Sequence, residues 1–199
     1  MMNVIEKIKT AETKKERVEL LKALIKKREE PRHPVDLEAD MLMERIKKWG
    51  ERYNGYDLNP EFQRGHVWSK LDQQKYIEAL MRGVLPRQAK TITLNICGWQ
   101  GEPITGDMPQ GLVCIDGLQR LTAIEAFKNK EITIFGGVDI DDLADTSFAL
   151  DNHYIHVAIY DYQNYKDVLD LYIDMNDTGV AHTQEEIERV KLIRQRVAE

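Results

Sequence analysis

The spacing of apolar residues predicts a chain rich in helices, with several strands in its second half. Apolar residues recur at three- and four-residue steps over 13–28, 36–52, 69–82, 119–128, 165–175 and 183–197, which predicts helices. Short β-branched or continuous apolar runs predict strands at 91–96, 112–115, 131–135 and 154–160. This order predicts an α+β fold, in which helices surround a small mixed sheet.

Two prolines divide the chain near its beginning. Pro31 and Pro34 interrupt the first helical pattern, which starts at Thr13 with the spacing of a capping box. We therefore expect a helical N-terminal arm over 1–33 and a compact domain over 34–199. The arm carries a net charge of +4. Its basic face is compatible with a solvated surface, a DNA-binding patch or a homodimer contact between the N-terminal helices.

The overall charge excludes some classes of protein. The chain has a net charge of −6, and ten Asp with a single Lys lie within 139–177, so it does not coat nucleic acid by bulk electrostatics. There is no apolar run of the roughly 18 residues that a membrane span needs, and no secretory signal at the start. Cys97 and Cys114 lie in strand-like runs, which favours buried free thiols and a cytoplasmic location.

The first candidate site is the junction between a strand and a helix at residues 115–122. Gly117 allows a positive φ and a close approach to the backbone, and the helix that follows presents unpaired N–H groups. Arg120 falls in the first turn, so the junction is suited to binding an anion. Asp116 would orient Arg120, hold a metal or activate water. The alternative is that Asp116 caps the helix and simply pairs with Arg120.

The second candidate site is the loop at 60–68, just ahead of the third predicted helix. Arg64 offers a planar pair of donors for two phosphate oxygens, and Gln63 can both donate and accept hydrogen bonds. His66 is a candidate general acid or base, although an isolated His usually has no such role. Trp68 is suited either to stacking on a base or to packing in the core.

Four motifs in a fixed order carry a resemblance to a known family. They are Pro-x-Phe-Gln-Arg-x-x-Val-Trp at 60–68, Gly-x-x-Pro at 83–86, Asp-Gly-x-Gln-Arg-Leu-Thr at 116–122 and Asn-x-x-Gly at 176–179. This order resembles the DGQR-motif domain of the ParB/sulfiredoxin-like superfamily, which forms the N-terminal half of GmrSD-type modification-dependent restriction enzymes and of related phage-defence proteins. The resemblance covers about residues 55–190.

The resemblance implies a ParB-like fold that binds and hydrolyses a nucleoside triphosphate in a DNA-related, phage or anti-phage role. The residues expected to be catalytic are Asp116, Arg120, Gln63 and His66. Those expected to bind the nucleotide and its phosphates are Arg64, Gly117, Gln119, Thr122 and Asn176, with Gly179 completing the last motif. The sequence departs from the family at Leu118, where a polar residue is common, and no HNH-type nuclease motif follows the last motif. With no Cys in the motif, sulfiredoxin chemistry is not expected.

The expected metal is Mg²⁺, brought by the phosphates of the nucleotide. A separate acidic run contains Asp139, Asp141, Asp142 and Asp145, but it lacks the glycine and terminal Glu of a calcium loop, which favours a solvated loop. Two other functions stay open. One is a metal-dependent DNA nuclease or nickase, and the other is a non-catalytic regulator that binds DNA or protein.

Overall fold

The computed structural model describes residues 3–65, 67–177 and 184–197 of the 199-residue chain. The chain forms two compact units, one ending at Glu30 and the other beginning at Pro31. This division falls three residues before the boundary expected from the prolines, because a strand of the second unit already begins at His33.

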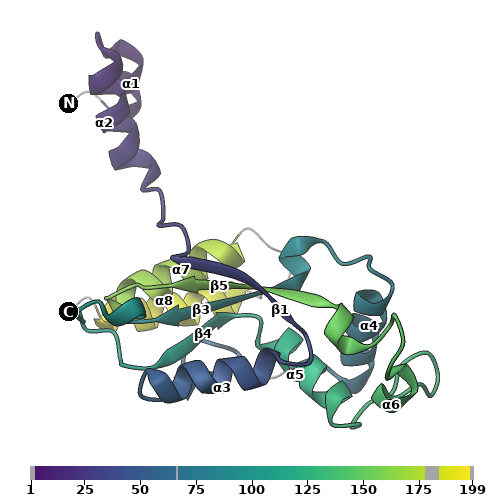
Figure 1. The fold of residues 1–199 in the computed structure, drawn as a ribbon. Helices are drawn as coiled ribbons and strands as arrows, with labels where there is room; N and C mark the ends of the chain where they lie inside the picture. Colours follow the sequence, from purple (N-terminus) through teal and green to yellow (C-terminus); the bar gives the residue numbers. More distant parts are fainter. Residues whose placement is uncertain (1–2, 66, 178–183, 198–199) are drawn as a thin grey trace. The chain divides into compact units, whose positions relative to one another are not determined.

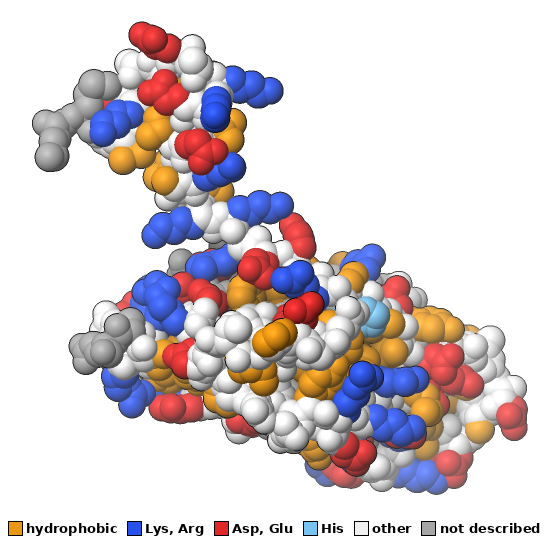
Figure 2. All heavy atoms as spheres, turned by 60° about the vertical axis from the view of Figure 1, so that its left-hand side comes forward, with side chains coloured by type: hydrophobic (Ala, Val, Ile, Leu, Met, Phe, Trp, Pro, Cys, Tyr) orange, Lys and Arg blue, Asp and Glu red, His pale blue; other side chains and the backbone are white. Residues whose placement is uncertain are grey.

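The first unit is a pair of short helices, α1 (Val4–Thr10) and α2 (Lys14–Ile25) (Figure 1). Thr13 caps α2 as predicted, since its side chain accepts a hydrogen bond from the Glu16 N–H at 3.1 Å. Neither helix contains a buried residue. Apolar side chains therefore lie on the surface of this unit among charged ones (Figure 2). The exposed large apolar residues are Val4, Ile5, Val18, Leu24 and Ile25.

The second unit is built on a five-stranded mixed sheet with the strand order β1-β5-β3-β4-β2. The strands are β1 (His33–Glu38), β2 (Tyr56–Asp57), β3 (Thr91–Ile96), β4 (Leu112–Asp116) and β5 (Tyr154–Tyr160). β3 pairs with β5 in parallel and with β4 antiparallel, while β1 and the two-residue β2 form the edges. The α+β class predicted from the sequence is confirmed by this sheet and the helices around it.

Helices cover both faces of the sheet (Figure 1). On one face lie α3 (Leu42–Arg52), α4 (Lys70–Met81) and α5 (Leu118–Lys128), which share a core with the apolar side chains Ile92, Leu94 and Ile96 of β3. On the other face, α7 (Tyr165–Asp177) and α8 (Gln184–Val197) pack on Val113 and Ile115 of β4. The shorter elements are α6 (Ile140–Leu143) and the 3₁₀ turns η1 (Arg87–Lys90), η2 (Trp99–Gly101) and η3 (Leu150–Asn152).

The predicted helix over 36–52 is wrong in its first part. Residues 33–38 form β1, which pairs antiparallel with β5, and the helix begins only at Leu42. Burial alternates along β1, with Val35 and Leu37 packed against the core and Asp36 exposed. Pro34 is tolerated because β1 is an edge strand, where a missing N–H leaves no neighbour unpaired.

The predicted strand over 131–135 is also wrong. Its pairing is limited to an isolated bridge between Ile134 and Val138. Phe135 has a φ of 48°, and Gly136 and Gly137 turn the chain back immediately afterwards. The apolar character of this segment reflects burial rather than pairing in the sheet, since Ile134 is packed in the core next to α4 and α5.

Two predictions about the chain as a whole can be compared with the structure. Cys97 and Cys114 are buried and form no disulfide, as expected. Burial and the nearby Asp116 carboxylate raise the pKa of the Cys114 thiol to about 12, so this thiol is unreactive. Within the described residues, no helix is both long and apolar enough to cross a membrane.

Candidate functional site

The junction between β4 and α5 is shaped by Gly117. Asp116 ends β4, Gly117 has a φ of 106° at the N-cap position, and α5 starts at Leu118. A Cβ atom at Gly117 would lie 2.5 Å from Ile92 Cδ1 and 3.1 Å from Ile92 Cα. Glycine is therefore required both by the backbone conformation and by the close packing of β3. The first turn of α5 is thereby held at the end of the sheet, with its N–H groups at the site.

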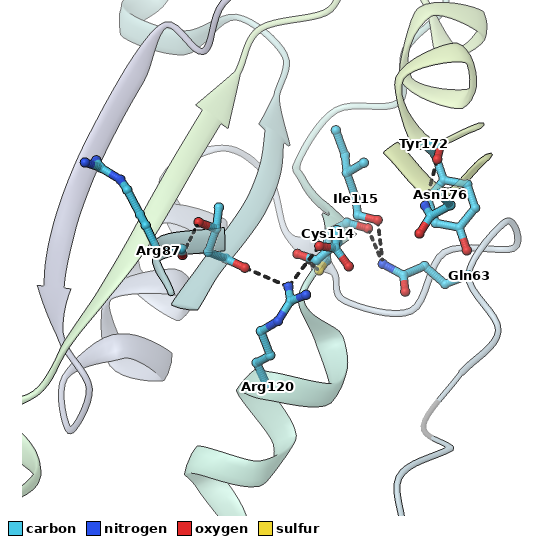
Figure 3. Close-up of polar contacts among 9 residues, drawn as sticks. Gln63, Arg87, Cys114, Ile115, Arg120, Tyr172 and Asn176 are labelled. Atoms are coloured by element: carbon cyan, nitrogen blue, oxygen red, sulfur yellow. Dashed lines mark hydrogen bonds and ion pairs between the residues drawn. The ribbon is translucent and has the colours of Figure 1, made fainter. Parts of the chain in front are cut away.

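Asp116 and Arg120 form an ion pair beside this turn (Figure 3). Arg120 Nη1 lies 2.9 Å from Asp116 Oδ2 and also donates to the Thr91 carbonyl oxygen at 2.8 Å. The Arg120 side chain is 22% exposed and the Asp116 side chain is 31% exposed. Within the described part of the chain, the hydrogen bonds of this guanidinium all leave from Nη1. Arg120 thus links β3 to β4, and its remaining N–H groups can serve a ligand.

Gln63 attaches the loop at 60–68 to the end of β4. Its Nε2 donates to the carbonyl oxygens of Cys114, at 2.8 Å, and Ile115, at 3.1 Å (Figure 3). On the other side of the loop, Arg189 of α8 donates to the Phe62 and Gln63 carbonyl oxygens at 3.3 and 2.8 Å. The amide of Gln63 is thus engaged by the protein itself, which is a positioning role.

Gln119 fastens the same loop to α5. Its Oε1 accepts hydrogen bonds from the Val67 and Trp68 N–H groups at 3.0 Å each, and its Nε2 donates to the Gly65 carbonyl oxygen at 2.6 Å. These bonds occupy both ends of the side-chain amide. Hydrogen bonds therefore connect the two sequence motifs, and each motif contributes one glutamine side chain, Gln63 or Gln119, to these bonds.

Arg64 projects from the middle of this loop. Its Nη1 lies 3.7 Å from Oε2 of Glu186 in α8, and the two side chains are 21% and 25% exposed. A partly buried arginine of this kind interacts more strongly with an anion than an arginine in bulk water would. Arg64 is thus placed to bind an anionic ligand, in competition with a carboxylate of the protein.

The two motifs meet at a cavity of about 580 Å³. It unites seven of the residues expected at the site: Gln63, Arg64, Asp116, Gly117, Gln119, Arg120 and Asn176. Thr122 is not part of its lining, because its Oγ1 donates to the Leu118 and Gln119 carbonyl oxygens within α5, both at 3.0 Å. His66 and Gly179 lie outside the described residues.

Six further lining residues were not expected from the sequence: Arg87, Gln88, Thr91, Leu118, Tyr172 and Met175. Trp68, for which the sequence leaves stacking on a base and packing in the core open, also lines the cavity. Tyr172 stands out: its ring centroid lies 5.1 Å from that of Phe62, and burial raises the pKa of its hydroxyl to about 12. The hydroxyl therefore stays protonated even at a pH at which an ordinary tyrosine would begin to ionise. Its only signal in the sequence was helical apolar spacing, which indicates a core position.

Arg87 is a further cation at the edge of the cavity. Its side chain points away from Arg120 (Figure 3). Its Nη2 lies 2.9 Å from His156 Nδ1 and 3.3 Å from His156 Nε2, and His156 Nδ1 also lies 2.7 Å from Asp36 Oδ1. Arg87 thus contacts His156 of the sheet and also lines the cavity, together with Arg64 and Arg120.

The described residues do not build a metal site of their own. No group of three or more His, Cys, Asp or Glu side chains is suitably placed among them. Asp116 is the carboxylate among the lining residues. One carboxylate together with phosphate oxygens is a common environment for Mg²⁺, so a metal carried by a nucleotide fits the residues present, and a dedicated metal site does not.

Comparisons with known proteins add no relative. No family model, curated protein or solved structure matches the chain.

Proposed function

We propose that the cavity binds the phosphate groups of a nucleoside triphosphate and hydrolyses it, as the resemblance to ParB-like DGQR-motif domains implies. One observation carries this proposal. Arg64 and Arg120, which belong to different motifs, line one cavity together with the first turn of α5. Guanidinium groups and helix N-terminal N–H groups both commonly bind phosphate in proteins. The volume of about 580 Å³ lies within the usual range for small-molecule sites.

Asp116 and Arg120 are proposed to carry the chemistry. The ion pair holds the Asp116 carboxylate at the cavity, where it is suited to orient a water molecule and to accept its proton. Arg120 and the N–H groups of α5 would stabilise the charge that develops on the transferred phosphoryl group. A Mg²⁺ ion bound to the phosphates would supply further charge neutralisation, with Asp116 as its ligand from the protein.

Phosphate release from the four common nucleoside triphosphates tests this proposal. We expect Asp116→Asn and Arg120→Gln to lower the rate by about 100-fold, the usual effect of removing one transition-state contact. Asp141→Asn is the matched control, because Asp141 is exposed and pairs with Lys130. Thermal melting of each variant checks folding. Full activity in both cavity variants would refute hydrolysis at this site.

The same samples separate the two other functions. Binding of a nucleotide in calorimetry without phosphate release would indicate a non-catalytic nucleotide-binding regulator. Conversion of supercoiled plasmid to relaxed or linear DNA with Mg²⁺ or Mn²⁺ would indicate a nuclease.

A further inference from the structure

Arg87 lines the cavity but has no part in the chemistry proposed for Asp116 and Arg120. It is the first residue of η1, and its backbone is fixed close to Arg120. The Thr91 hydroxyl donates to the Arg87 carbonyl oxygen at 2.9 Å, and the Thr91 carbonyl oxygen accepts from Arg120 Nη1 at 2.8 Å. Since the backbone of Arg87 already borders the cavity, rotation of its side chain is enough to change the group that its guanidinium contacts.

The lining residues give the cavity two chemically different ends. At one end, Tyr172 and Met175 of α7 contribute an aromatic ring and a thioether. At the other end, Arg87 of η1 contributes a positive charge. Arg120 lies between these ends, bonded to Thr91 next to η1 (Figure 3). A nucleoside is suited to the first end and phosphates to the second, so the last phosphate of a nucleotide would lie nearest η1.

His156 of β5 competes with such a phosphate for Arg87. Within the described residues, the side-chain hydrogen bonds of Arg87 all leave from Nη2 and go to the His156 ring. An imidazole accepts a hydrogen bond only in its neutral form, so this contact lacks the attraction between opposite charges that a phosphate offers. The Asp36 side chain beside the ring is 58% exposed, so water screens its charge. Arg87 therefore gains by exchanging His156 for a phosphate oxygen.

We propose that Arg87 binds the terminal phosphate of the nucleoside triphosphate, and that it leaves His156 when the nucleotide enters. This inference rests on the proposed function. Asp116 and Arg120 act at the centre of the cavity, whereas Arg87 adds a positive charge at the η1 end, where the third phosphate lies. The attraction of a cation also grows with the charge of the anion. For both reasons, Arg87 favours a triphosphate over the matching diphosphate.

The test compares triphosphates with diphosphates on the whole chain. Imido analogues of the four common nucleoside triphosphates, which resist hydrolysis, and the matching diphosphates are titrated with Mg²⁺ in a calorimeter. We expect Arg87→Gln to bind a triphosphate analogue about tenfold more weakly than the native protein, and the diphosphate about equally well. Tenfold is about 1.4 kcal/mol, the order expected for the loss of one hydrogen bond to a charged group.

Two further variants separate the contact from a general effect of charge. Lys90→Gln removes a positive charge from the same turn but from outside the lining of the cavity, and should leave both affinities unchanged. His156→Leu removes the competing acceptor and should tighten triphosphate binding a few-fold, but only when Arg87 is present. In the Arg87→Gln background, His156→Leu should therefore have no effect. Thermal melting checks the folding of each variant.

The outcomes are distinguishable. If the native protein binds a triphosphate analogue and Arg87→Gln keeps the same preference over the diphosphate, the role of Arg87 is refuted and the proposed function stands. An equal loss in Lys90→Gln would also refute the contact. If His156→Leu does not tighten binding, or does so equally without Arg87, the exchange with His156 is refuted. If the native protein binds none of the analogues, both proposals are refuted.

Discussion

The side-chain oxygen of Gln119 accepts a hydrogen bond from the Trp68 N–H at 3.0 Å, across 51 positions of sequence. Gln119 belongs to the motif at the start of α5, and Trp68 ends the loop motif. This contact links the two motifs, because the side-chain amide of Gln119 in the α5 motif fixes the backbone of the loop motif. The sequence predicts that Gln119 binds the ligand, whereas in the fold its side-chain amide bonds to the backbone of the loop.

Replacing Gln119 should therefore act directly on the stability of the loop backbone, and only through the loop on phosphate binding. Gln119→Ala removes three hydrogen bonds to the backbone of residues 65–68, and we expect it to lower the free energy of unfolding by about 1–3 kcal/mol. Denaturant unfolding measures the loss, and amide exchange at Trp68 should become faster. Gln74→Ala, which removes a single bond to the Thr133 carbonyl oxygen, should cost less. Unchanged exchange at Trp68 would contradict the structural role.

Gly117 is expected to tolerate a side chain poorly. Gly117→Ala strains a backbone with a φ of 106° and brings a methyl group against Ile92. We expect a loss of about 2–4 kcal/mol in unfolding free energy. Gly136→Ala is the matched control, because its φ is 84° but no atom lies within 4 Å of the added Cβ. It should cost about 1 kcal/mol. Equal losses at the two positions would show that the contact with Ile92 is unimportant.

Asp170 should make stability depend on acidic pH. Burial alone would raise its pKa, but hydrogen bonds from Arg194 and Lys166 outweigh burial and hold the pKa below 3.8. Since the folded pKa is lowered, the stabilisation is present above the unfolded value and is lost as the pH falls through the folded one. We expect Asp170→Asn to cost about 2–3 kcal/mol at pH 7 and less at pH 3.

Urea unfolding of the native protein and Asp170→Asn at the two pH values measures this difference. Glu188→Gln, which removes one partner of an exposed ion pair, should have little effect at either pH. A destabilisation by Asp170→Asn that is the same at pH 3 as at pH 7 would contradict the role assigned to the charged pair between α7 and α8.

The first unit is expected to mediate association. Its two helices have 7 and 12 residues and expose five large apolar side chains, so they gain stability from a partner surface. We propose a second copy as the partner. Light scattering should then give a dimer for the whole chain and a monomer after deletion of residues 1–30. The melting temperature of the second unit should stay unchanged, because residues 31–199 form a compact unit by themselves. The same oligomeric state for the whole chain and for the chain without residues 1–30 would refute association through the first unit.

Local signals in the sequence were sufficient for several elements. The capping box of Ser69 and Asp72 marks the start of α4, and the positive φ of Gly83 follows its end. Elements that depend on distant partners were missed. β1 contains Pro34 and is a strand only because β5 lies beside it. The segment at 131–135 has the apolar character of a strand, but Gly136 and Gly137 turn it away.

The candidate site, like the fold, could be predicted from the sequence only in part. The motifs identified residues that line one cavity, because their chemistry and order are visible in the sequence. The roles within that group depend on contacts across the fold. Gln63 and Gln119 bond to backbone atoms some 50 positions away, which no local pattern reveals. Glu186 is an ordinary first-turn acidic residue of a helix until Arg64 is placed beside it.

The hydrogen bond from Arg189 to the Gln63 carbonyl oxygen joins residues 126 positions apart. A ribosome releases the loop and the β4–α5 junction well before it completes α8. During synthesis, the loop therefore remains without this support until α8 has emerged from the ribosome. A nascent chain that stops short of α8 is therefore expected to lack the support that Arg189 gives to the loop.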